Sequence, residues 1–138
     1  MRRGLFLFAL ALAALATTHV QAQTRETQQR NLDRYLQFAG APVDEFPFWS
    51  LYQWELVGSD KVVVWSTVKN AYLLSVAQPC TKLQWAKAIG VTSNQRHVVS
   101  RAFDFVTASG ESCKIEQIRP IDYAAMLKQG RGEDKTKS

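Results

Sequence analysis

Between residues 24 and 39, apolar side chains recur at intervals of three and four, the spacing of one face of an α-helix. Thr24 and Thr27 are suited to cap the start of this helix, and Gly40 with Pro42 would end it. Its apolar face would carry Leu32, Tyr35, Leu36 and Ala39. The pattern therefore predicts an N-terminal helix with one apolar stripe.

After residue 46 the pattern becomes strand-like, and a first strand is predicted at about 48–57. One face of this strand would carry Phe48, Tyr52, Trp54 and Leu56, and the other would carry Trp49, Leu51 and Val57. Apolar residues on both faces are typical of a strand packed between two layers or interrupted by a bulge.

Turn residues then divide the chain into a meander of three strands. The sequence "GSDK" at 58–61 connects the first strand to "KVVVWSTV", and "KN" at 69–70 connects that strand to "AYLLSV". Asparagine tolerates the positive φ that two-residue hairpin turns require. We therefore expect consecutive antiparallel neighbours here.

A short helix and two further strands follow the meander. The sequence "TKLQWAKAIG" predicts a helix of one to three turns that Thr81 caps and Gly90 ends. Its apolar face would carry Leu83, Ala86 and Ile89. Strands are predicted near 98–107 and 113–120, and a last short helix begins beyond Pro120.

This order predicts an α+β fold that is mainly β. Full helices do not separate successive strands, which disfavours a parallel doubly wound sheet. About five antiparallel strands would form a curled sheet or small barrel with a helix at each end. The predicted organisation is a signal peptide at 1–22, an N-terminal helix and linker at 23–45, a β-rich domain at 46–128 and a disordered polar tail at 129–138.

The first 22 residues have the pattern of a secretory signal peptide. Arg2 and Arg3 precede an apolar run from residue 4 to residue 16, and residues 20–22 fit the small-x-small cleavage rule. The run of about 13 residues is shorter than the roughly 20 that span a bilayer, which disfavours a membrane anchor. We expect a periplasmic or secreted protein without a membrane span after cleavage.

Charge and motifs exclude several classes of function. The formal net charge is +5, two units of which would leave with Arg2 and Arg3. The other basic residues are scattered and do not alternate with aromatic residues, so nucleic acid is not an expected partner. A Gly-rich phosphate loop, a Gly-x-Ser-x-Gly elbow and a His-Glu-x-x-His pair are also missing from the sequence.

The chain has two cysteines, Cys80 and Cys113. In an exported protein such a pair indicates a disulfide, which would clamp the β-rich domain by roughly 3–4 kcal/mol because it closes a loop of about 30 residues. The spacing is unlike a Cys-x-x-Cys redox motif. With His97 as the one other ligand of the mature chain, the set is poor for zinc. A thiol nucleophile beside His97 is the remaining alternative. We expect no metal or cofactor.

Asp104 is the most notable carboxylate, because it lies between Phe103 and Phe105 in a predicted strand. Strand alternation points it away from the two rings. We expect it to face solvent, where Arg101 or Arg119 would pair with it, and we keep it as a candidate ligand contact.

Aromatic residues are dense, above all between residues 46 and 54. Large rings fill the core of a small domain, and this is the favoured interpretation. The alternative is a binding platform, for which Trp49 and Tyr52 are the candidates. These two lie on different faces of the predicted strand, so one of them must point outward.

Two segments, "AYLLSVAQPCTKLQWAKAIGV" and "FDFVTASGESCKIEQIRPID", resemble a family of small exported bacterial proteins catalogued as a domain of unknown function. The shared features are a Tyr-Leu-Leu strand that runs into a cysteine and a Cys-x-Ile-x-x-Ile-x-Pro ending. The resemblance covers about residues 46–123. It implies export and a Cys80–Cys113 pair, and it implies neither an activity nor a catalytic residue.

The leading hypothesis is a non-catalytic exported module that binds an envelope protein or polysaccharide. One alternative is an enzyme whose site combines Asp104, His97 or Arg119. Another is an inhibitor of an extracellular enzyme that acts through the loop at 91–97.

Overall fold

The protein is described by a computed structural model, which gives the backbone of residues 15–136 and the side chains of residues 24–136. The predicted signal peptide at 1–22 lies largely outside these residues. The described chain contains α1 (Leu15–Gln37), β1 (Glu45–Pro47), β2 (Gln53–Leu56), β3 (Lys61–Trp65), β4 (Ala71–Val76), the 3-10 turn η1 (Leu83–Trp85), β5 (Gly90–Val91), β6 (Val98–Ser100), β7 (Phe105–Ala108), β8 (Glu111–Ile121) and α2 (Tyr123–Thr136).

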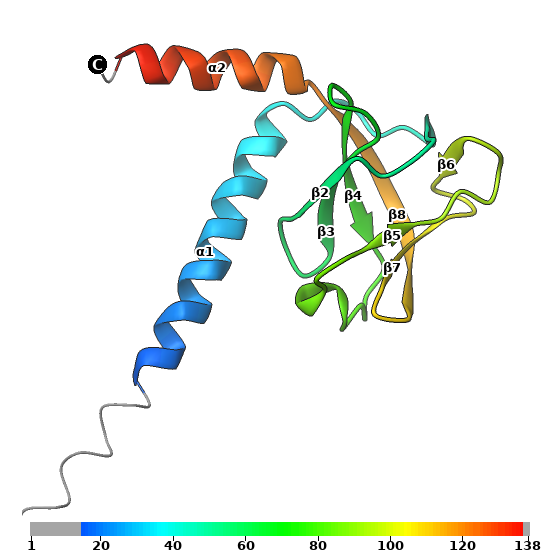
Figure 1. Ribbon diagram of the computed structural model, residues 1–138, viewed down its shortest axis with the longest axis horizontal. Coiled ribbons are helices and arrows are strands. Elements are labelled where there is room, and N and C mark those ends of the chain that lie inside the picture. The colour runs from blue at the N-terminus through cyan, green and yellow to red at the C-terminus, as the bar shows by residue number, and fades with distance from the viewer. Residues whose placement is uncertain (1–14, 137–138) are drawn as a thin grey trace, which may run out of the picture.

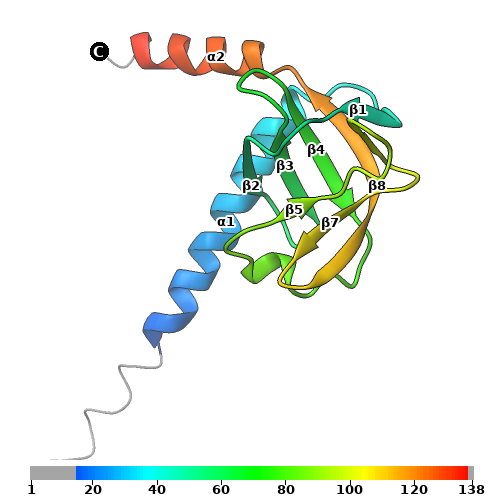
Figure 2. The same ribbon diagram turned by 45° about the vertical axis from the view of Figure 1, so that its right-hand side comes forward.

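Six strands form one antiparallel sheet in the order β2-β3-β4-β8-β7-β5, and β1 pairs with β6 in a second sheet. The larger sheet curls into a half-barrel (Figures 1 and 2). The α+β, mainly β fold is therefore confirmed, and the predicted meander is present as β2, β3 and β4. The strand number exceeds five because β1 and β5 form where none was predicted and the predicted fourth strand is split into β6 and β7.

Strand β3 separates two apolar cores. Val62 and Val64 belong to the core inside the half-barrel, whereas Val63 and Trp65 belong to the core on its outer face. Successive side chains of a strand point to opposite faces, so an unbroken apolar run supplies both layers.

The inner core is centred on aromatic rings from β1 and β4. Phe46 is 2% exposed and stacks on Tyr72, with ring centroids 4.0 Å apart. Phe48 meets Phe46 edge-on at 6.1 Å. Burial raises the pKa of Tyr72 above its ordinary value. The dense aromatics between residues 46 and 54 thus serve mainly as core, with the exceptions described below.

Helix α1 covers the outer face of the sheet, as Figures 1 and 2 show. Its Tyr35 packs edge-on against Trp65, with ring centroids 6.1 Å apart. A polar contact accompanies this packing, because the Glu55 carboxylate on β2 accepts hydrogen bonds from the Tyr35 hydroxyl and from Asn31 Nδ2 at 2.8 Å. Burial first, and then the bond to Glu55, raise the pKa of Tyr35 well above its ordinary value.

The predicted strand at 48–57 is shortened to β2. The chain from 48 to 52 is irregular because its backbone bonds to two different neighbours: Phe48 N donates to His97 O at 2.9 Å and Tyr52 N donates to Trp65 O at 2.8 Å. The predicted two-residue turn at 69–70 is wrong as well. The connection runs over 66–70 and is organised by the Thr67 hydroxyl, which accepts the amides of Lys69 and Asn70.

The predicted helix over "TKLQWAKAIG" is present only at its shortest predicted length, and its predicted start and end are wrong. The structure has a single 3-10 turn, Leu83–Trp85, with no side-chain cap, and Gly90 begins β5 instead of ending a helix. Thr81 does not cap the turn because its amide and hydroxyl both donate to Glu111. Leu83 is buried as predicted, whereas Trp85 is 71% exposed.

Helix α2 extends through most of the segment predicted as a disordered tail at 129–138. Asp122 caps its start by accepting the amide of Ala125 at 3.1 Å. The helix continues to Thr136, whose hydroxyl donates to the Glu133 carbonyl at 2.8 Å. Helical hydrogen bonds are local, so a polar segment can continue a helix without burying further side chains.

Candidate functional site

An exposed pair of stacked rings lies beside the β1–β6 sheet. Trp49 is 72% exposed, and its ring stacks on the His97 imidazole with centroids 4.8 Å apart and planes inclined by 14°. The stack connects the segment after β1 to the loop before β6. A backbone hydrogen bond joins the same two segments, because Phe48 N donates to His97 O at 2.9 Å. We call Trp49 and His97 the ring platform.

The loop at 92–97 presents His97 in a fixed conformation. His97 has φ 59°, in the left-handed region that residues other than glycine rarely adopt. The Ser93 hydroxyl lies within hydrogen-bonding distance of both the Gln95 carbonyl and the Val98 carbonyl, at 2.8 and 2.6 Å. The loop is therefore closed on itself around the histidine. Arg96 is exposed beside it.

Asp104 is buried beneath this loop, and its predicted exposure is wrong. Its side chain is 0% exposed. One carboxylate oxygen accepts the Thr92 hydroxyl and the Asn94 amide, both at 2.8 Å. The other accepts the Ser100 amide at 2.7 Å. The predicted strand at 98–107 breaks into a turn at 101–104, and the turn directs the carboxylate inward.

The predicted arginine partners of Asp104 bond elsewhere. Arg101 pairs with Asp44 at 3.0 Å. Arg119 donates from Nε to the Gly40 carbonyl at 2.9 Å and thereby fixes the linker after α1. Asp104, His97 and Arg119 consequently do not converge on one reaction centre, and the Asp104 carboxylate already accepts three donors.

Tyr52, the other candidate for a binding platform, is 59% exposed. Among the ring contacts of the described residues, Trp49 stacks on His97 and Tyr52 takes part in none. Both candidate rings of the sequence analysis are thus exposed, as are Trp85 and Phe103, but the sequence did not identify His97 as the partner of Trp49. A contact between residues 48 positions apart leaves no local pattern.

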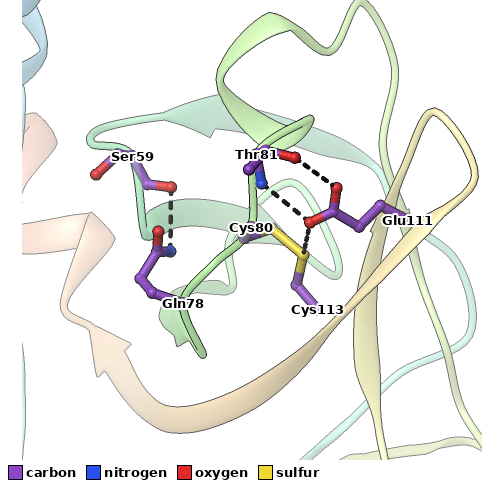
Figure 3. Close-up of a disulfide and its surroundings, with 6 residues drawn as sticks. All are labelled: Ser59, Gln78, Cys80, Thr81, Glu111 and Cys113. Carbon is purple, nitrogen blue, oxygen red and sulfur yellow. Dashed lines mark hydrogen bonds between the residues drawn. A yellow bond between two sulfur atoms is a disulfide. The ribbon is translucent and has the colours of Figure 1, made fainter.

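The two cysteines form the predicted disulfide, which ties the segment after β4 to the start of β8 (Figure 3). Both are 3% exposed. Glu111 lies against the bridge: its carboxylate accepts the Thr81 amide at 2.9 Å and the Thr81 hydroxyl at 3.0 Å. This carboxylate was not singled out from the sequence, because its proximity to Cys80 arises only from the fold.

A shallow pocket of about 440 Å³ lies where α1 ends against β8, and its lining residues are Gln37, Phe38, Ala39, Gly40, Pro120, Ile121 and Asp122. Its titratable residue, Asp122, already caps α2. The backbone around it is paired, for Gly40 N donates to Pro120 O and Asp122 N donates to Phe38 O, both at 2.8 Å. The pocket thus brings together no reactive groups.

A comparison with protein-family models matches residues 1–137 to a family of unknown function, DUF6491. The chain belongs to this family. The match extends beyond residues 46–123 and includes α1 and α2, so the family pattern is wider than the segments quoted from the sequence. Neither the curated proteins nor the solved structures contain a match to the chain. Within the described residues, no helix is both long enough and apolar enough to cross a membrane.

Proposed function

We propose that the protein is a non-catalytic exported module that binds an acidic envelope polysaccharide through the ring platform of Trp49 and His97. The observation that carries the proposal is the stacked geometry of two exposed rings, 4.8 Å apart. A ring held flat by a partner offers an apolar face for stacking without first losing side-chain freedom.

The surroundings of the platform support a rigid binding surface. Asp104 fixes the loop at 92–97 from below, and His97 retains an uncommon backbone conformation. Such conformations persist only where neighbouring structure enforces them, and they cluster at ligand sites. The exposed Arg96 adds positive charge, which favours an acidic ligand over a neutral one.

The alternative of an enzyme has less support from the geometry. Asp104 is enclosed by three donors, and Arg119 is engaged by the linker after α1. An inhibitor that acts through the loop at 91–97 would use the same surface with a protein partner. The binding experiment separates these partners.

The test is sedimentation of the purified protein with peptidoglycan, an envelope polysaccharide that carries carboxylates. W49A should weaken binding by about tenfold, which corresponds to about 1.4 kcal/mol. W85A is the matched control, since Trp85 is 71% exposed but belongs to η1 and makes no ring contact among the described residues. Equal behaviour of the two variants, or no sedimentation of wild type, would contradict the proposal. Capture of an extracellular enzyme in place of the polysaccharide would favour inhibition.

A further inference from the structure

The disulfide and Glu111 form a cluster of three metal-ligating side chains. The sulfur atoms of Cys80 and Cys113 and a Glu111 carboxylate oxygen all lie within 4.8 Å of one another. Glu111 Oε1 is 3.6 Å from Cys113 Sγ (Figure 3). The cluster is independent of the ring platform, because it joins the start of β8 to the segment after β4.

Thr81 holds the Glu111 carboxylate in place. Its amide donates to Oε1 at 2.9 Å and its hydroxyl donates to Oε2 at 3.0 Å. Each oxygen retains lone pairs beyond these bonds. Hydrogen bonds of this kind orient carboxylate ligands in metal sites.

We propose that reduction of the Cys80–Cys113 bridge converts this cluster into a site for a thiophilic divalent cation such as Zn²⁺. Two thiolates and one carboxylate are a donor set that zinc accepts, and water would complete a tetrahedral shell. In the oxidised protein the sulfurs are bonded to each other, so no thiolate is available to a cation.

A phosphine can reduce the bridge: the S–S bond breaks, the phosphine takes the oxygen of one water molecule and becomes the phosphine oxide, and the two protons of that water complete the two thiols. A dithiol reaches the same state by exchange, because it supplies two electrons and its own two protons and becomes a disulfide itself. When the cation binds, each thiol releases its proton to solvent and forms a metal–sulfur bond. Oxidation and metal binding are therefore mutually exclusive states of the same two sulfur atoms.

The required movement is small. Zn–S bonds of about 2.3 Å in a tetrahedral shell place two sulfurs about 3.8 Å apart. The Cα atoms of Cys80 and Cys113 are 5.8 Å apart, so rotation of the two side chains can provide this separation without moving the backbone of either cysteine. Both cysteines are buried and Glu111 is half-buried, so the cation would enter from the side of the carboxylate.

The experiment titrates the full chain with Cd²⁺ alone, before and after reduction by a phosphine, and records thiolate-to-metal charge-transfer absorption. Reduced wild type should bind one ion per chain, and the oxidised protein should show no such absorption. Competition with a chromophoric chelator then gives the affinity for Zn²⁺. E111Q should weaken that affinity by about tenfold or more, the usual effect of changing a group at a metal site.

E116Q is the matched control, since Glu116 is an exposed residue of the same strand, β8, and it should bind as wild type does. Far-UV circular dichroism monitors whether the reduced chain stays folded. Equal affinities of wild type and E111Q would show that the cation binds two thiolates of a flexible chain, and this result would overturn the proposed site. So would charge-transfer absorption in the oxidised protein, or its absence after reduction.

Discussion

At the scale of single residues, Asp104 fixes the loop that carries His97. Its carboxylate accepts donors from three positions of the chain, Thr92, Asn94 and Ser100. A buried carboxylate without such donors would be costly, and the three bonds offset its desolvation. The residue therefore holds the chain on both sides of His97, at Thr92 and Asn94 before it and at Ser100 after it.

D104N should lower the free energy of unfolding by about 2–3 kcal/mol, because an amide group would face N–H and O–H donors with a donor of its own. Chemical denaturation measures this difference. D134N, at an exposed position of α2, is the control and should change stability by less than about 0.5 kcal/mol. If both variants unfold alike, Asp104 does not organise the loop.

The alternation of apolar and polar residues predicted that Asp104 would be exposed, because a turn without glycine or proline is not visible in that pattern.

At the scale of elements, the attachment of α1 combines ring packing with hydrogen bonds to the half-buried Glu55 carboxylate. The sequence predicted the helix and its stripe, and Tyr35 of that stripe is buried against the sheet. It did not predict which strand would receive the helix, because the two elements meet only through residues 20 positions or more apart. The same limit applies to Thr81, whose hydrogen bonds to Glu111 replace the cap that its sequence position suggested.

Y35F should lower stability by about 1–2 kcal/mol near neutral pH, since it removes a hydrogen bond to a carboxylate. The raised pKa of Tyr35 gives this difference a pH dependence. A tyrosine in the unfolded chain ionises at about pH 10, whereas Tyr35 in the folded chain stays neutral to higher pH. The stabilisation is therefore complete below about pH 10 and is lost as the pH rises beyond it.

Denaturation of wild type and Y35F at about pH 8 and about pH 11 checks this expectation. The stability gap between them should shrink at the higher pH. Y52F is the control: it alters an exposed tyrosine, so its stability should equal that of wild type at both pH values. A gap that stays constant between the two pH values would show that ionisation of Tyr35 is not linked to folding.

At the scale of the whole molecule, the Cys80–Cys113 bridge joins the segment that follows the β2-β3-β4 meander to β8, across a sequence separation of 33. Periodicity, turn residues and the cysteine pair were enough to predict a mainly β domain with this bridge. They did not predict the second sheet, because β1 and β6 are each three residues long and pair across about half the domain. Elements that short have no periodicity of their own.

Replacing both cysteines by alanine should lower stability by about 3–4 kcal/mol, the chain-entropy value for a loop of this size. The melting temperature should fall by on the order of 10 °C. Thermal unfolding followed by circular dichroism measures it, and wild type reduced by a phosphine in the absence of metal serves as the second measurement. A melting temperature unchanged in both samples would contradict a stabilising bridge.

The position of α1 has a consequence for how copies of this protein behave in solution. On the face that the helix covers, Val63 lies opposite Leu73 and Trp65 lies opposite Ala71 on the adjacent strand. A chain in which α1 had detached would expose this apolar patch to other molecules, and exposed apolar patches favour aggregation. The helix thus covers a surface that would favour self-association if it were exposed, so α1 contributes to solubility as well as to the core.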